Sequence, residues 1–465
     1  MALYKGYEAV IGLEIHVELK THTKMFCACK NAFGAEPNTV CCPVCMGMPG
    51  ALPTLNEKAV EYAVMAGIAT NCKINTVSAM ARKNYFYPDL PKGYQITQGQ
   101  YPIAEKGYLE IEGKRVGITR IHMEEDAGKL IHRQNKTLVD FNRCGVPLIE
   151  IVTEPDIESA AQAKAFLKKL RSVLLYTGIS DCKMNEGSMR CDVNLSVRKP
   201  GNVLGVRTEM KNINSFSFVE KAVEYEYRRQ ADLLESGGNV IQETRRFDEN
   251  TGKTFSMRSK ENAADYRYFP EPDLPTVYVT EEQIKSIKES RPVMPHERIA
   301  LYEDRYGIAP RDAERLTALL ENADIFEAAA MKCRHVQVLA KQMLTFPMDA
   351  PICLCPAQLC GIADMTGDGK INSSTAKALL LLCQNTEVDP EKYAKEHELF
   401  QISDRNLLWQ MLSDAAKSDP KSVSDYQNGK AAAGKALVGR VMAESRGRAD
   451  AKILQELLQE LKKII

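Results

Sequence analysis

Residues 12–19 read Gly-Leu-Glu-Ile-His-Val-Glu-Leu and alternate strictly between apolar and polar side chains. A period of two is typical of a β-strand that buries one face, so the apolar side chains are expected on one side of the strand. Glu14, His16 and Glu18 then project from the other side. Because a strand is a rigid element, the pattern predicts three acid, base or metal-binding groups held side by side.

A second acidic stretch, His-Met-Glu-Glu-Asp, occupies residues 122–126. Mg²⁺ prefers oxygen ligands and bridges phosphate groups, and two adjacent acids on a turn, Glu124 and Glu125, can direct their carboxylates at one ion or at two. With Glu14 and His16 they form a candidate site for phosphoryl transfer, where positioning and charge neutralisation do most of the work. The same residues fit a solvated acidic loop and a hydrogen-bonded structural histidine, so both interpretations stay open. Further acids, and a lysine that can meet a phosphate, are Glu186, Asp192, Glu209 and Lys211.

Two close cysteine pairs, Cys27-x-Cys29 and Cys42-x-x-Cys45, follow the first strand. Four thiolates on two turns suit the tetrahedral coordination of a structural zinc ion. Unmetallated, partly buried thiols are one alternative, and redox chemistry at the second pair is another. Cys41 has no assigned role. A later set is less convincing because it lacks a clear fourth partner; it comprises Cys353, Cys355 and Cys360, with Cys383 as a candidate.

An aromatic and basic loop spans residues 82–95, and a similar segment spans residues 266–275. Cations beside aromatic rings can contact a phosphate and stack on a base, which makes Lys83, Tyr85 and Tyr87 candidate substrate-binding residues. The alternative is a packed loop whose aromatic rings are simply buried.

The periodicities predict an α+β fold in three parts: a mixed α/β region at 1–295, a helical domain at 296–405 and a small helical tail at 406–465. Strands are expected at 108–112 and 116–121. Helices are expected at 57–70, 157–176, 216–236, 323–332 and 336–345.

Composition excludes several function classes. The 61 basic and 61 acidic residues give zero formal net charge, which argues against a generic basic nucleic-acid coat but permits a local basic face. The N-terminus lacks a signal-like apolar run, and no apolar stretch reaches the roughly 18 residues of a membrane span, so we expect a cytoplasmic protein without membrane association.

Phosphate-loop, dinucleotide and nucleophile-elbow motifs are absent. A nucleotide must therefore be held in another way.

Several long motifs resemble the GatB/GatE family, the B subunits of tRNA amidotransferases. They are Gly-Leu-Glu-Ile-His-Val-Glu-Leu, the two cysteine pairs, Arg-Lys-Asn-Tyr-Phe-Tyr-Pro-Asp-Leu-Pro-Lys-Gly-Tyr-Gln-Ile, His-Met-Glu-Glu-Asp-Ala-Gly-Lys, Pro-Leu-Ile-Glu-Ile-Val-Thr-Glu-Pro-Asp and Tyr-Arg-Tyr-Phe-Pro-Glu-Pro-Asp-Leu-Pro. The resemblance covers essentially the whole chain. It implies a catalytic cradle with a zinc knuckle, a helical domain and a YqeY-like tail domain.

The resemblance also implies a reaction: ATP phosphorylates the side-chain carboxyl of Glu on tRNA(Gln), of Asp on tRNA(Asn), or of both. Ammonia then displaces the phosphate and gives Gln-tRNA(Gln) or Asn-tRNA(Asn). A partner amidase, the A component, hydrolyses glutamine to supply the ammonia through a channel, and a small C component completes the heterotrimer. The activity is that of an ATP-dependent carbon–nitrogen ligase with glutamine as amido donor.

The family pattern places magnesium-binding and catalytic roles on five positions of the cradle and, by a weaker match, on a sixth. These are Glu14, His16, Glu124, Glu125, Glu209 and, more weakly, Glu186. Zinc at the cysteine pairs is then structural rather than part of the chemistry. The tail is expected to grip tRNA by shape and backbone, through Lys430, Lys435, Arg440, Arg446 and Arg448.

Two alternatives belong to different classes. A non-catalytic, zinc-containing tRNA-binding subunit would have no need of converging acids on the first strand and at 122–126. A free-standing metallohydrolase is disfavoured, because the sequence has no nucleophile motif and no histidine-rich zinc motif.

Overall fold

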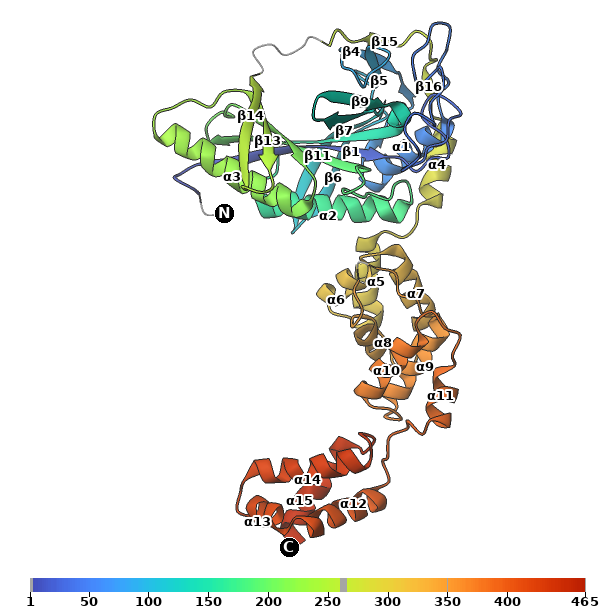
Figure 1. The fold of residues 1–465 in the computed structure, drawn as a ribbon, viewed down its shortest axis with the longest axis vertical. Coiled ribbons are helices and arrows are strands. Elements are labelled where there is room, and N and C mark those ends of the chain that lie inside the picture. The colour runs from blue at the N-terminus through green and yellow to red at the C-terminus, as the bar shows by residue number, and fades with distance from the viewer. Residues whose placement is uncertain (1–2, 260–265, 349, 465) are drawn as a thin grey trace. The chain divides into compact units, whose positions relative to one another are not determined.

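The computed structural model describes residues 3–259, 266–348 and 350–464. It divides into two compact units, Met1–Met294 (unit 1) and Pro295–Ile465 (unit 2) (Figure 1). Unit 1 combines a mixed sheet with helices, and the elements described in unit 2 are helices. The predicted α+β class, with strands and helices mixed first and a helical region after them, is confirmed.

The described residues of unit 1 form a sheet of twelve strands, in which β1 is central. In spatial order, the main path runs β14 (Lys253–Ser259), β13 (Glu243–Asp248), β12 (Thr208–Ile213), β11 (Met189–Arg198), β1 (Glu8–Glu18), β10 (Pro147–Thr153), β7 (Lys114–Glu125), β5 (Tyr94–Thr97), β4 (Ala81–Asn84) and β15 (Phe269–Pro270). The pairings along this path are antiparallel except for β12 with β13. Off this path, β6 (Ala104–Ile111) pairs with β7, and β2 (Lys73–Ile74) pairs with β6.

The alternation predicted at residues 12–19 is present in β1. Its odd-numbered apolar side chains are fully buried, and its even-numbered polar side chains are half-buried. The strand register places His16 opposite Glu150 of β10 on one side and opposite Arg190 of β11 on the other. Glu150 in turn lies opposite His122 of β7. Directly opposed residues point to the same face, so these four strands share one polar face.

Three helices pack against the sheet of unit 1 and cover one of its faces: α1 (Glu57–Ala69), α2 (Ala160–Thr177) and α3 (Phe216–Glu235) (Figure 1). The first and third agree with the predicted ranges to within one residue. The prediction that α2 begins at Ile157 is wrong. Ile157 instead forms a β-bridge to Ile11 of β1. The Ser159 side chain accepts a hydrogen bond from the Gln162 N–H and so caps the helix, which begins at Ala160.

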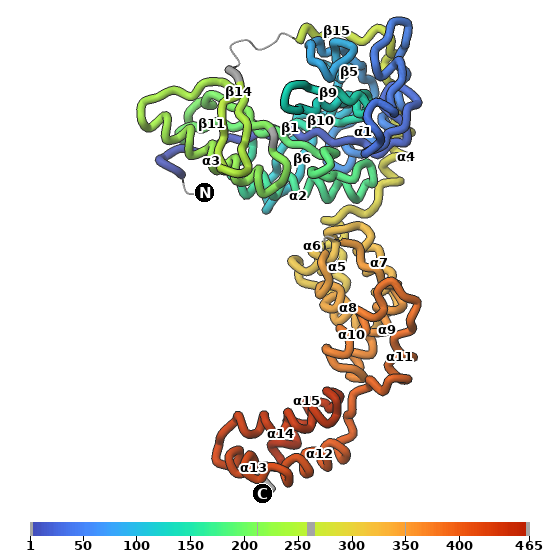
Figure 2. The backbone as a smooth tube through the Cα atoms, viewed as in Figure 1, coloured from blue at the N-terminus to red at the C-terminus, as the bar shows by residue number. Residues whose placement is uncertain are grey.

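The remaining elements of unit 1 are short. They are β3 (Val77–Ser78) paired with β16 (Val277–Tyr278), β8 (Lys129–Arg133) paired with β9 (Lys136–Asp140), the 3₁₀ turn Phe141–Arg143 and α4 (Glu281–Ser290). The segment between β1 and α1 contains no helix or strand and runs as an irregular path, visible in blue in Figure 2. It carries the two predicted cysteine pairs.

Unit 2 contains eleven described helices: α5 (Pro295–Tyr306), α6 (Pro310–Leu316), α7 (Leu320–Ala330), α8 (Val336–Met343), α9 (Pro356–Gly367), α10 (Ser373–Cys383), α11 (Pro390–Glu396), α12 (Arg405–Ser418), α13 (Pro420–Gln427), α14 (Ala431–Glu444) and α15 (Ala451–Ile464). Its buried apolar side chains form two clusters, one within residues 302–394 and one within 408–461. Among the described helices of both units, none is long and apolar enough to cross a membrane.

Candidate functional site

The polar face of the sheet holds a compact cluster of two carboxylates and an imidazole. His16 Nε2 lies 3.4 Å from Glu124 Oε1 and 3.3 Å from Glu150 Oε2. One potential ligand atom of each of the three residues lies within 4.8 Å of the others. They come from three neighbouring strands, β1, β7 and β10, whose register sets their spacing. This donor set, with its two carboxylates, can hold a divalent cation.

A second histidine extends the cluster. His122 Nε2 lies 3.4 Å from Glu150 Oε2 and 3.8 Å from Glu124 Oε2. Burial alone disfavours the charged imidazole, but the two carboxylates raise the pKa of His122 to about 9. Burial likewise opposes ionisation of Glu150, and the two imidazoles hold its pKa below the usual value. The carboxylates are therefore ionised at neutral pH, and an incoming cation would replace the imidazole protons that pair with them.

The structure also shows two site residues that the sequence analysis missed, Glu150 and His122. Glu150 alternates with apolar neighbours in Pro-Leu-Ile-Glu-Ile-Val-Thr, and His122 lies two residues before Glu124 in β7. His122 has the strand parity of Glu124, which was chosen, whereas no candidate was chosen in β10. Alternation could have indicated them, but only the cross-strand register shows that they meet.

Glu14 and Glu209 lie further along the same sheet, in a second group of polar side chains. Asn194 Nδ2 donates to Glu14 Oε1 over 2.7 Å. Lys211 Nζ lies 3.0 Å from Glu209 Oε1 and 2.7 Å from Asp192 Oδ2. A cavity of about 230 Å³, with both apolar and polar walls, opens beside Glu14. This group combines three acids with one lysine and adjoins a space that can accept a ligand.

Glu125 does not join the cluster. It is the last residue of β7, so the prediction that Glu124 and Glu125 lie on a turn is wrong, and neighbouring side chains of a strand point to opposite faces. Glu125 pairs with the Lys92 ammonium and accepts from the Ile96 N–H over 2.9 Å. Glu186 pairs with Lys183 over 3.0 Å in the turn before β11.

The two aromatic and basic segments meet in the sheet, where β4 pairs with β15. Lys83 Nζ lies 5.0 Å from the ring centroid of Tyr266 and 6.0 Å from that of Tyr85. Burial alone lowers the pKa of Lys83, but the negative charge of Glu124 and other nearby groups raises it above the usual value. The register of β4, β5 and β7 places Lys83 on the same face of the sheet as Glu124, whereas Tyr87 is exposed, with 59% of its surface accessible.

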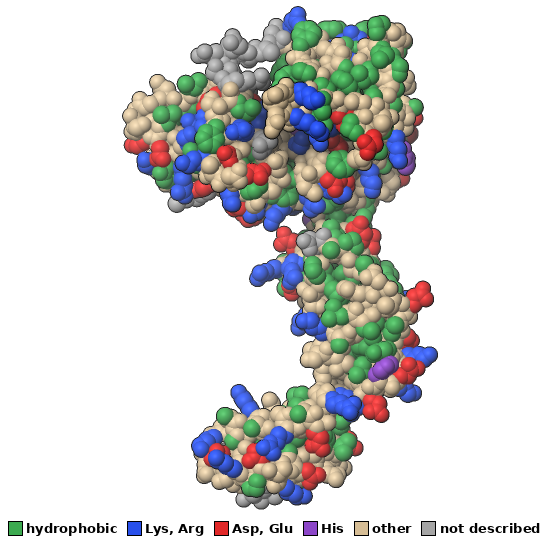
Figure 3. Space-filling model, viewed as in Figure 1, with side chains coloured by type: hydrophobic (Ala, Val, Ile, Leu, Met, Phe, Trp, Pro, Cys, Tyr) green, Lys and Arg blue, Asp and Glu red, His purple; other side chains and the backbone are tan. Residues whose placement is uncertain are grey.

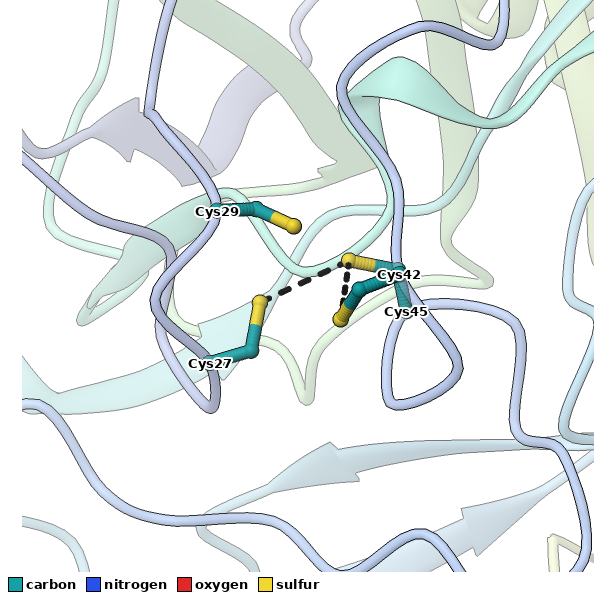
Figure 4. Close-up of side chains that lie close together, drawn as sticks. All are labelled: Cys27, Cys29, Cys42 and Cys45. Atoms are coloured by element: carbon teal, nitrogen blue, oxygen red, sulfur yellow. Dashed lines mark hydrogen bonds between the residues drawn. The ribbon is translucent and has the colours of Figure 1, made fainter.

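The four predicted zinc ligands converge. The Sγ atoms of Cys27, Cys29, Cys42 and Cys45 all lie within 4.8 Å of one another, and Figure 4 shows the side chains directed toward a common centre. Cys45 Sγ is 3.5 Å from Cys27 Sγ and 3.8 Å from Cys42 Sγ. A zinc–sulfur bond of about 2.3 Å gives a tetrahedral edge of about 3.8 Å, so the donor set fits a zinc ion.

The surroundings of this cysteine cluster support a metal. Lys24 is buried, and its Nζ lies 3.4 Å from Cys45 Sγ. The hydrogen bond from Cys27, together with the nearby Lys24 ammonium, lowers the pKa of Cys45. Cys41 Sγ instead donates to the Asn38 carbonyl oxygen over 3.5 Å. A cavity of about 190 Å³ has both this cluster and Glu125 in its wall.

The predicted tRNA-binding residues lie in or beside α14. Lys430 pairs with Asp425 over 2.9 Å, and Arg440 pairs with Asp419 over 2.8 Å. Arg448 Nη1 donates to a backbone carbonyl oxygen over 2.7 Å, and Lys435 and Arg446 are exposed. The face of this part shown in Figure 3 carries basic and acidic side chains intermixed. These pairs leave the basic groups accessible at the surface, where a phosphate can compete for them.

Comparisons with known proteins match nearly the whole chain. The model of the GatB/GatE catalytic domain matches residues 9–285, and the GatB domain model matches residues 335–461. The B subunit of the aspartyl/glutamyl-tRNA(Asn/Gln) amidotransferase from Caldicellulosiruptor saccharolyticus is 50% identical over 98% of this chain and 100% of its own length. The corresponding protein of Carboxydothermus hydrogenoformans is 47% identical over 98% and 99%.

Proposed function

The chain belongs to the GatB/GatE family of tRNA amidotransferase B subunits, and we propose that its unit 1 uses ATP to phosphorylate the side-chain carboxyl of Glu on tRNA(Gln), Asp on tRNA(Asn), or both. Ammonia released from glutamine then displaces the phosphate and leaves the amide. The observation that carries this proposal is the buried cluster of His16, Glu124 and Glu150 on the sheet. A protein that only binds tRNA has no need of such a cluster.

The proposed chemistry follows from the poor reactivity of a carboxylate. Its oxygen is a bad leaving group, and phosphorylation converts it into a good one. Mg²⁺ bound at the cluster would offset the repulsion between the attacking carboxylate and the ATP phosphates. Glu124 and Glu150 would supply the oxygen ligands that this ion prefers, and neutral His16 would complete the donor set.

Two lysines are placed to neutralise phosphate charge. We assign Lys83 to the transferred phosphate, because the register of β4, β5 and β7 puts it on the same face as Glu124, whose charge raises the pKa of Lys83. Lys211 lies beside Glu209 and Asp192 in the group that also contains Glu14, where it can meet the phosphates of the nucleotide. The cavity beside Glu14 is the candidate space for the nucleotide base.

The same proposal includes partners and a structural metal. The amidase and the small C component would form a heterotrimer with this chain in the cytoplasm, and the tail at 406–465 would bind tRNA through the basic residues of α14 and its flanks. Zn²⁺ at the four-cysteine cluster would hold the irregular segment between β1 and α1 in place.

The test is phosphate release from ATP by the chain purified with its amidase and small C partners, with Mg²⁺, in the presence and absence of misacylated Glu-tRNA(Gln). We expect phosphate release that depends on the charged tRNA. In Glu124→Gln the rate of this release should fall by at least about 100-fold. The control is Glu110→Gln, an exposed acid of β6, which should retain full activity. Activity that survives in Glu124→Gln would refute the assignment of the cluster. Absence of tRNA-dependent release with tRNA binding intact would favour a non-catalytic role in tRNA binding.

A further inference from the structure

Unit 2 contains a group of two thiols and a carboxylate that the proposed function does not use. Cys360 and Asp364 lie one turn apart on α9, and Cys333 lies in the turn between α7 and α8. One potential ligand atom of each lies within 4.8 Å of the other two. The sequence had grouped Cys360 with Cys353 and Cys355, but both of those residues are exposed.

The Asp364 carboxylate has one oxygen near each thiol, so the three groups lie close enough to share one metal ion. Cys333 Sγ lies 3.4 Å from Asp364 Oδ1, and Cys360 Sγ lies 3.9 Å from Asp364 Oδ2. Zinc–sulfur bonds of about 2.3 Å and zinc–oxygen bonds of about 2.1 Å give tetrahedral edges of about 3.6–3.8 Å. We propose that Cys333, Cys360 and Asp364 bind a thiophilic divalent cation of the Zn²⁺ class, separately from the four-cysteine cluster of unit 1.

The Asp364 carboxylate is oriented as a metal-binding carboxylate needs to be. Its Oδ1 accepts from the backbone N–H of Arg334 over 2.9 Å and from that of His335 over 3.2 Å. Its Oδ2 accepts from Arg334 Nε over 3.2 Å. Metal-binding carboxylates are typically held by such outer hydrogen bonds, which fix their direction.

The charges balance when a divalent ion is added. Two thiolates and one carboxylate carry three negative charges, the ion carries two positive charges, and the Arg334 guanidinium supplies the third. Each cysteine binds such an ion as its thiolate. Binding of the ion would therefore release the thiol protons.

The location gives the ion a structural role. Cys333 is buried at the edge of the apolar cluster within residues 302–394, which α7, α8 and α9 share. Coordination would tie the α7–α8 turn to α9, and an ion from solvent would enter beside Cys360, which is only partly buried. A fourth position, open to water, completes the tetrahedron.

Metal content tests the proposal directly. The full-length chain and the double variant Cys333→Ser/Cys360→Ser are loaded with Zn²⁺, passed over a weak chelating resin and analysed for zinc and protein. The double variant should hold one zinc ion fewer per chain. The control Cys353→Ser/Cys355→Ser should match the wild type. Equal zinc content in the wild type and in Cys333→Ser/Cys360→Ser would overturn the proposal.

A second measurement needs no variant and stays decisive if the double variant fails to fold. Cysteine alkylation of the wild type, mapped by mass spectrometry, should show Cys360, which is only partly buried, protected with Zn²⁺ and released by a strong chelator. Cys353 and Cys355 should react under both conditions. Protection that ends only after a reductant is added would indicate a disulfide and overturn the metal site, as would equal reactivity with and without Zn²⁺.

Discussion

Glu271 and Asp273 both bind Arg82, yet they differ in burial, and this difference predicts very different costs when each is neutralised. Arg82 Nε lies 2.7 Å from Glu271 Oε2, and Arg82 Nη2 lies 2.8 Å from Glu271 Oε1, which makes a two-bond pair. Arg82 Nη2 also lies 3.0 Å from Asp273 Oδ2. The side chain of Glu271 is fully buried, whereas 38% of the side-chain surface of Asp273 is exposed.

Removing one partner of a buried ion pair typically costs about 3–5 kcal/mol, because the other charge is left uncompensated. For Glu271→Gln we expect about 3 kcal/mol, the low end, since Arg82 keeps Asp273 as a partner. For Asp273→Asn we expect about 0–1 kcal/mol, because solvent screens the exposed carboxylate and the stronger pair stays intact. Both changes keep the shape of the side chain.

Hydrogen exchange followed by mass spectrometry measures this cost locally, on peptides that contain β4 and β5. Roughly 3 kcal/mol corresponds to exchange about a hundredfold faster in Glu271→Gln, and about 1 kcal/mol to about fivefold in Asp273→Asn. Trp409, the chain's one tryptophan, lies in unit 2, so its fluorescence during denaturation should be the same in both variants. Equal exchange in the two variants would refute the argument from burial.

Three further predictions concern the carboxylate cluster, a buried ion network and a close backbone contact. Glu150→Gln should raise the Mg²⁺ concentration needed for half-maximal tRNA-dependent phosphate release by at least about tenfold; an unchanged Mg²⁺ dependence would contradict its role as a ligand. Burial alone raises the pKa of Glu226, but its guanidinium and hydroxyl donors hold it below the usual 4.5. The stability that this carboxylate contributes is therefore present above pH 4.5 and is lost as the pH falls below it. In Glu226→Gln, the stability of unit 1, measured by proteolysis, should fall less steeply on the acid side than in the wild type. In Gly107→Ala the new Cβ would lie 2.2 Å from Cys72 Sγ, so the free energy of unfolding of unit 1, measured by urea denaturation, should fall by about 1–3 kcal/mol. Gly12→Ala is the control and should cost less, because the nearest neighbour of its new Cβ would be 3.9 Å away.

Local signals in the sequence predicted the elements that depend on local physics. The alternation at residues 12–19 identified β1, and the starts of α1 and α3 agree with the predictions because Asn56 and Ser215 cap them. The start of α2 was misplaced because Ile157 is held in a bridge to β1, a tertiary contact that overrides its apolar helical pattern. Spacing also sufficed for the four-cysteine cluster, since two short turns bring the pairs together.

Spacing was not sufficient for Cys360. Its neighbours in the sequence, Cys353 and Cys355, are exposed. The thiol closest to the Asp364 carboxylate belongs to Cys333, which lies between α7 and α8. The packing of α7, α8 and α9 decides that meeting, and no local pattern encodes it.

The adjacent acids of β7 show how register turns one sequence motif into two environments. Glu124 faces the imidazoles of the polar face, whereas Glu125 faces Lys92 and shares a cavity wall with the four-cysteine cluster. Because strand neighbours alternate, a register slip of one residue would exchange the two environments and bury a carboxylate without its cation. The pairing of β7 with β10, which sets Glu150 opposite His122, is therefore what commits Glu124 rather than Glu125 to the candidate metal site.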